Sequence, residues 1–151
     1  FSHTGPRRGK NFSISCDAYQ IAKMMLGKQD KTLSVGNLDT IRVVIDVRDC
    51  VKAYYLLMQS EKSLGKVFNV CGDVPRKMGF YTEELLSLSN LKGVEKWVNP
   101  KYYRPIDIDY QHGDSSELKE LTDWEPEYEI NRTLSDLLAY WINKLSIVRI
   151  K

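Results

Sequence analysis

Residues 36–49 read GNLDTIRVVIDVRD, and this stretch decides how the rest of the chain is interpreted. Its centre, residues 41–47, is apolar and β-branched with almost no alternation, which predicts a strand covered on both faces. From Asp46 onward the apolar residues adopt helical spacing as far as Met58, and Asp46 or Asp49 is placed to cap that helix. The stretch therefore predicts a buried strand that leads directly into a helix.

Strands and helices alternate on both sides of this stretch. Apolar residues at helical spacing predict further helices at residues 17–26, 81–88 and 133–145, and a capping-box pattern predicts a short helix beginning at 114–118. Short apolar runs predict further strands at 33–38, 66–72 and 94–100. Residues 102–114 keep neither period and are predicted to form an extended loop. This alternation favours an α/β fold.

Length and composition narrow the classes of function. A chain of 151 residues with 42% apolar and 28% charged residues is typical of one globular domain, which we place at 1–151. A formal net charge of +2 argues against a nucleic-acid or membrane binder. The three cysteines are widely spaced, which predicts reduced thiols rather than metal ligands. We therefore expect a cytoplasmic protein without a metal site.

The sequence contains no recognisable catalytic machinery. A glycine-rich turn between a first strand and helix, the phosphate-binding fingerprint of dinucleotide folds, is missing. Tyr54, Tyr55 and Tyr81 each lack a lysine four residues later, the spacing of the acid–base pair of short-chain dehydrogenases. We therefore assign no catalytic residue to this chain.

Residues 3–12, HTGPRRGKNF, combine residues that interrupt helices and strands with adjacent positive charges. Gly5 and Pro6 interrupt regular structure just before two adjacent arginines. Arginine stays charged at any working pH and matches the geometry of phosphate oxygens. This segment predicts a loop that presents positive charge to a phosphate.

Four ordered motifs resemble the extended short-chain dehydrogenase/reductase enzymes that act on nucleotide sugars. They are most similar to the group formed by GDP-mannose 4,6-dehydratase and GDP-4-keto-6-deoxymannose reductase. Residues 3–12 resemble the motif Asn-His-x-Ser-Pro-Arg-Arg-Gly-x-x-Phe, and residues 36–49 resemble Gly-Asn-Leu-x-x-x-Arg-Asp. Residues 102–114 resemble Tyr-Phe-Arg-Pro-x-Glu-Val-Asp followed by Gly-Asp, and residues 122–126 resemble Leu-Gly-Trp-x-Pro. The resemblance runs from Phe1 to about Trp141.

The resemblance implies that the chain is the C-terminal, substrate-binding half of such an enzyme, with a small mixed sheet and several helices. The N-terminal Rossmann half, which holds most of the NADP site and the catalytic residues, would lie outside this chain. The implied partners are GDP-mannose or a related GDP-sugar, the N-terminal half and a second copy in a homo-oligomer. We expect the chain alone to be inactive.

The resemblance also assigns roles to particular residues. Arg42 and Arg104 match the two arginines that bind the diphosphate, and Asp107 lies where a glutamate binds the ribose. His3 and Arg8 match loop positions that contact NADP. Two departures matter: Cys16 replaces a lysine near the diphosphate, and Val43 replaces the aspartate after the arginine. Arg48, on the following helix, is expected to face solvent.

Three interpretations remain open. The leading hypothesis is a dehydratase, which PRRG and RPIDID favour. The reductase, favoured by SISCDAYQIAK and NVCGD, or another nucleotide-sugar dehydratase or epimerase is the alternative. The third is a non-catalytic domain that binds a nucleotide sugar or a partner subunit.

Overall fold

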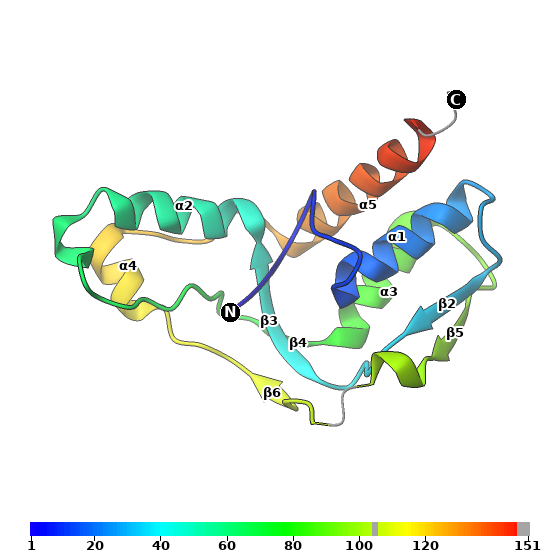
Figure 1. The fold of residues 1–151 in the computed structure, drawn as a ribbon, viewed down its shortest axis with the longest axis horizontal. Coiled ribbons are helices and arrows are strands. Elements are labelled where there is room, and N and C mark those ends of the chain that lie inside the picture. The colour runs from blue at the N-terminus through cyan, green and yellow to red at the C-terminus, as the bar shows by residue number, and fades with distance from the viewer. Residues whose placement is uncertain (104–105, 148–151) are drawn as a thin grey trace.

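A computed structural model describes residues 1–103 and 106–147 (Figure 1). Its helices are α1 (Ser13–Met25), α2 (Val47–Met58), α3 (Met78–Ser89), α4 (Ser116–Thr122) and α5 (Ile130–Ile147), with short 3-10 turns η1 (Glu61–Ser63) and η2 (Pro100–Tyr102). The strands are β1 (Ser2–Thr4), β2 (Thr32–Val35), β3 (Ile41–Asp46), β4 (Pro75–Lys77), β5 (Glu95–Val98) and β6 (Tyr110–Gln111). The expected α/β class with small mixed sheets is confirmed.

Strand β3 is the centre of the larger sheet. Its C-terminal part pairs in parallel with β1, and its N-terminal part pairs antiparallel with β4 and in parallel with β6. This pairing covers both edges of β3, and Val43, Val44 and Ile45 are buried, as the unbroken apolar run predicted. Residues from both ends of the chain are thereby brought to one strand.

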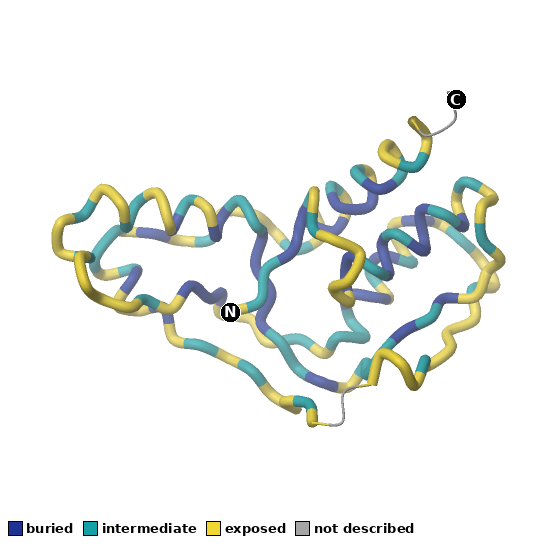
Figure 2. Tube along the Cα trace, in the orientation of Figure 1, coloured by how far each residue is buried: buried dark blue, intermediate teal, exposed yellow. Residues whose placement is uncertain are grey.

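Most of the core lies on one side of β3. Helices α1, α3 and α5 pack together there, next to the two-stranded parallel sheet β2–β5 (Figure 1). A smaller cluster on the other side of β3 joins α2 and α4 through residues that include Cys50, Leu118 and Trp124. Figure 2 shows the buried positions gathered on the inner faces of these helices.

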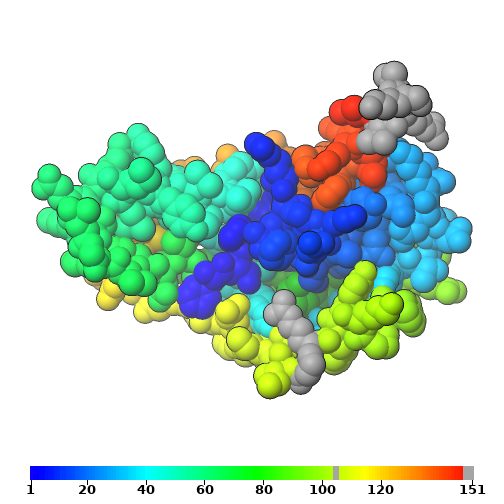
Figure 3. Space-filling model, viewed as in Figure 1, coloured from blue at the N-terminus to red at the C-terminus, as the bar shows by residue number. Residues whose placement is uncertain are grey.

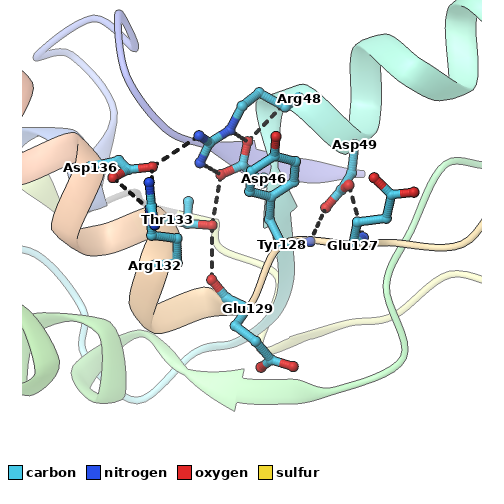
Figure 4. A network of polar contacts seen from close by, with 9 residues as sticks. All are labelled: Asp46, Arg48, Asp49, Glu127, Tyr128, Glu129, Arg132, Thr133 and Asp136. Carbon is cyan, nitrogen blue, oxygen red and sulfur yellow. Dashed lines mark hydrogen bonds and ion pairs between the residues drawn. The ribbon is translucent and has the colours of Figure 1, made fainter.

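The turn from β3 into α2 is held by a polar network (Figure 4). Asp46 caps the helix by accepting from the backbone N of Arg48 at 2.7 Å, which confirms it as the cap. The Arg48 guanidinium donates to both oxygens of the same carboxyl group, from Nε to Oδ1 at 2.8 Å and from Nη2 to Oδ2 at 2.7 Å. It also forms an ion pair with Asp136 of α5 at 2.9 Å, and its central carbon lies 3.8 Å from the centre of the Tyr128 ring. The expectation that Arg48 simply faces solvent is therefore wrong.

Segment 66–72 is not a strand in this structure, so that prediction is wrong for the described chain. Its backbone carbonyls at Val70 and Cys71 accept from the amino group of Phe1 and the hydroxyl of Ser115, and no ladder forms among the described residues. A strand needs a neighbouring strand to satisfy its backbone groups. The opposite difference occurs at β1: the structure has a strand there, whereas the sequence predicts a loop. Three consecutive polar residues show no alternation of apolar and polar side chains, so nothing in the local pattern indicates a strand.

Candidate functional site

A cleft of about 1250 Å³ opens between β1 with its following loop, the N-terminal part of α1, β3 and residues from 101–103 and 106–111. Figure 3 shows the N-terminal segment lying across the front of the molecule, above residues near 100–110. Four of the five predicted site residues line this cleft: His3, Arg8, Arg42 and Asp107. The fifth, Arg104, lies outside the described residues.

His3 and Arg8 form a pair on one wall. A turn closed by the bond from Arg8 N to Gly5 O, 3.1 Å, brings the guanidinium back to β1, where Nη1 donates to His3 Nε2 at 3.2 Å. Burial and the charge of Arg8 lower the pKa of His3, which keeps the ring neutral and able to accept that bond at pH 7. The Arg8 guanidinium also lies 3.4 Å from the centre of the Phe12 ring.

Arg42 and Asp107 form the second pair. Because β6 pairs with the start of β3, segment 106–109 lies beside Arg42, and Asp109 O accepts from Ile41 N at 2.7 Å. Arg42 Nη2 lies 3.0 Å from Asp107 Oδ1, with the two side chains 14% and 22% exposed. Arg42 Nη1 donates to the Ile41 carbonyl at 2.8 Å. The guanidinium is thus held in place at the cleft before any ligand contacts it.

The lining of the cleft includes two buried polar residues, Thr4 and Asp17, that sequence reasoning missed. Thr4 is 3% exposed and Asp17 is 4% exposed. Asp17 Oδ2 accepts from Thr82 Oγ1 at 2.8 Å, and burial raises the pKa of Asp17 to about 7. The predicted helix began at Asp17, where a carboxylate would be a solvated end residue. Helix α1 begins four residues earlier, at Ser13, so Asp17 lies within the helix, four residues before buried Ile21 and on the same face.

The cleft suits an anionic, phosphate-bearing ligand. Its lining includes the cations Arg8, Lys10, Arg42 and Lys101. Two buried polar atoms, Thr4 Oγ1 and Arg8 Nε, have no hydrogen-bond partner among the described residues. Unsatisfied buried groups of this kind cost about 1–3 kcal/mol each. The Arg8 wall therefore fits a cofactor phosphate, as the resemblance implies for NADP.

A metal site and a membrane-spanning helix are both absent from the part of the chain that the structure describes. No group of three or more histidine, cysteine or acidic side chains there could hold a metal ion. No helix there is long and apolar enough to cross a membrane. The three cysteines are unpaired thiols; Cys50 and Cys71 are buried, whereas Cys16 is half-buried beside the cleft.

Comparison with known proteins identifies a matching family. The model of the family described as GDP-mannose 4,6 dehydratase matches residues 1–137, which include both arginine-containing walls of the cleft. The chain belongs to this family. Among curated members, it is 32% identical over 145 residues to the GDP-6-deoxy-D-mannose reductase of Pseudomonas aeruginosa, covering 96% of this chain and 47% of that protein. It is 28% identical to human GDP-mannose 4,6 dehydratase, covering 91% of this chain and 41% of that one.

Solved structures of other proteins share the fold. A structure of RMD from Pseudomonas aeruginosa complexed with NADPH superposes with a TM-score of 0.87 at 30% identity, covering 95% of this chain and 47% of that one. The UDP-glucuronic acid 4-epimerase of Bacillus cereus, at 20% identity and a TM-score of 0.78, shows the fold alone. The chain spans about half the length of the curated relatives it matches.

Proposed function

We propose that residues 1–151 are the GDP-sugar-binding, C-terminal half of a GDP-mannose 4,6-dehydratase. The observation that carries this proposal is the Arg42–Asp107 pair, which lines the same cleft as the Arg8–His3 pair. Arg42 would bind the diphosphate, together with Arg104, and Asp107 would bind the ribose. A fixed guanidinium suits this role because two parallel hydrogen bonds to phosphate need a defined orientation.

The proposed reaction is oxidation at C4 of the mannose ring, elimination of water across C5–C6 and return of the hydride. The chemistry that NADP supplies when bound is the acceptance and return of that hydride. His3 and Arg8 would hold one edge of the cofactor, because both line the cleft. The acid–base groups for this reaction would come from the N-terminal half.

Exposed apolar side chains on the chain support the proposal that a partner half covers part of its surface. Helix α2 exposes an apolar stripe formed by Val51, Tyr54, Tyr55 and Met58. In segment 66–72, Val67 is also exposed, at 89%. Contiguous apolar surface of this kind marks an interface. The relatives carry more than this chain's length again, so we assign the surface to their NADP-binding half, with cytoplasmic homo-oligomers as the expected assembly.

A reductase is the second candidate, and the 32% identity to GDP-6-deoxy-D-mannose reductase favours it. The two activities consume different substrates. The intact natural protein would be incubated either with GDP-mannose and NADP or with GDP-4-keto-6-deoxymannose and NADPH. Loss of GDP-mannose without net NADPH formation supports the dehydratase, whereas NADPH consumption supports the reductase.

The binding role is tested with Arg42→Ala. Removing a charge-assisted contact worth about 1.5–3 kcal/mol should weaken GDP-mannose binding by about ten- to a hundredfold, most strongly at low salt. Arg42→Lys should restore only part of the affinity, because an ammonium lacks the bidentate geometry. The matched control is Arg132→Ala, whose side chain is 70% exposed on α5 and lies outside the cleft lining. Equal affinities for all four proteins, measured by calorimetry, would contradict the assignment.

A further inference from the structure

Asp17 is a buried carboxyl group in the wall of the cleft, and the proposed function assigns it no role. It projects from α1 toward α3, where Thr82 Oγ1 donates to it at 2.8 Å. This hydroxyl is its one hydrogen-bond donor in the part of the chain that the structure describes, and no cationic side chain there forms an ion pair with it. Arg8 and Arg42 line the same cleft without contacting it.

An ionised carboxylate in this position is unfavourable. Burial without a cationic partner removes its hydration, and a single hydroxyl donor offsets only part of that cost. Burial therefore raises the pKa of Asp17 to about 7 despite the bond from Thr82. Near neutral pH the group holds its proton in part of the molecules and has lost it in the rest.

The surrounding groups leave Asp17 as the titrating group in this range. The elements packed against α1 present Thr82 from α3, Trp141 from α5 and Tyr102 from η2 to this part of the helix. Burial and then the Asp17 charge raise the pKa of Cys16, and the Cys16 thiol and burial raise the pKa of Tyr102. The pKa of His3 across the cleft is lowered instead. These three shifts all lead away from neutrality.

We propose that binding of a nucleoside diphosphate sugar in this cleft is coupled to the uptake of one proton by Asp17. The class of ligand rests on the proposed function. Two phosphate charges enclosed in the same cleft raise the energy of a carboxylate there, so the ligand favours the protonated form. Coupling is reciprocal, so protonation of Asp17 strengthens binding and affinity falls as the pH rises through neutrality.

The experiment is calorimetric titration of GDP-mannose into the intact natural protein, from about pH 6 to about pH 8.5, in buffers with different ionisation heats. GDP-mannose is the suitable probe because its two phosphates are diesters and keep their charge across this range. Wild type should take up close to one proton at slightly alkaline pH, and its affinity should fall by up to roughly tenfold per pH unit. Asp17→Asn should show a flat profile without this uptake.

Two comparisons separate the possible outcomes. Thr82→Val removes the donor that favours ionised Asp17, so the fall in GDP-mannose affinity should occur at higher pH than in wild type. Guanosine, which has no phosphate charge, should bind without proton uptake. Equal proton uptake in wild type and Asp17→Asn overturns the inference and leaves the proposed function intact. If Asp17→Asn fails to fold, an unmoved profile in Thr82→Val overturns it. Absence of GDP-mannose binding at every pH overturns both.

Discussion

Single residues in this chain are defined by their partners as much as by their type. Arg42 and Arg48 lie six positions apart and both contact a carboxylate. Arg42 does so at the rim of the cleft, where a ligand can compete for it. Arg48 instead fixes the start of α2 to α5 through Asp46 and Asp136. We therefore expect the first to affect binding and the second to affect stability.

Replacing Arg48 with alanine should destabilise the intact natural protein by about 1.5–3 kcal/mol, because buried Asp46 keeps only its bonds from Thr133 and the backbone. Partial exposure of Arg48 places the effect toward the lower end. Arg132→Ala, which removes only an exposed i,i+4 pair, should cost about 0.5 kcal/mol or less. Urea unfolding measures both, and similar losses would contradict the structural role of Arg48.

The pH dependence of stability gives a second test of this network. Burial alone would raise the pKa of Asp46, but the hydrogen bonds from Arg48 and Thr133 outweigh it and hold the pKa below its ordinary value. The stabilisation is therefore fully present above about pH 4, the pKa of an unfolded aspartate, and is lost as the pH falls through the folded value. Arg48→Ala should lose less stability than wild type on this acidification, and an unchanged acid profile would count against the network.

Asp107 occupies the Arg42 guanidinium and therefore competes with phosphate for it. Asp107→Ala should weaken GDP-mannose binding by roughly tenfold, because the proposed ribose contact is lost. Inorganic pyrophosphate has no ribose, so the same variant should bind it as well as wild type or better. Titration of both ligands into both proteins measures this difference. A parallel loss for both would show that Asp107 chiefly orients Arg42.

At the scale of elements, segment 66–72 shows how a strand depends on its neighbours. Its sequence has strand character, yet the described chain offers it no adjacent strand. Phe68 and Val70 still pack with the smaller core cluster, so the segment lies in place without a ladder. Helix α2 is comparable: it forms, but its apolar stripe remains exposed.

We expect segment 66–72 to become a strand in the intact natural protein. Its backbone amides should then exchange slowly with deuterium, whereas in the isolated 151-residue chain they should exchange rapidly. The amides of β3 serve as the internal control, because β3 is paired within this chain and should be protected wherever the chain is folded. Protection of 66–72 in the isolated chain, or its absence from the intact protein, would contradict the assignment of this surface to a partner half.

On the scale of the whole molecule, the chain has a core and a binding cleft but is proposed to lack the reactive groups. The isolated chain should therefore show no turnover of GDP-mannose with NADP and should bind an apolar dye through the α2 surface. Circular dichroism would confirm that this chain is folded during the assay. Measurable turnover by the folded, isolated chain would overturn the division of roles between the two halves.

The sequence by itself determined the α/β class, the approximate positions of the helices and three of the six described strands, β2, β3 and β5, because periodicity and capping are local properties. It also determined the family, because four motifs occur in a fixed order. Only the tertiary structure decided that Arg42 meets Asp107, that Arg48 is bound by Asp46 and Asp136, and that Asp17 is buried in the cleft. These facts depend on contacts between residues up to 88 positions apart, as for Arg48 and Asp136, and no local pattern encodes them. The strand predicted at 66–72 failed for the same reason, since a strand is completed by its neighbour.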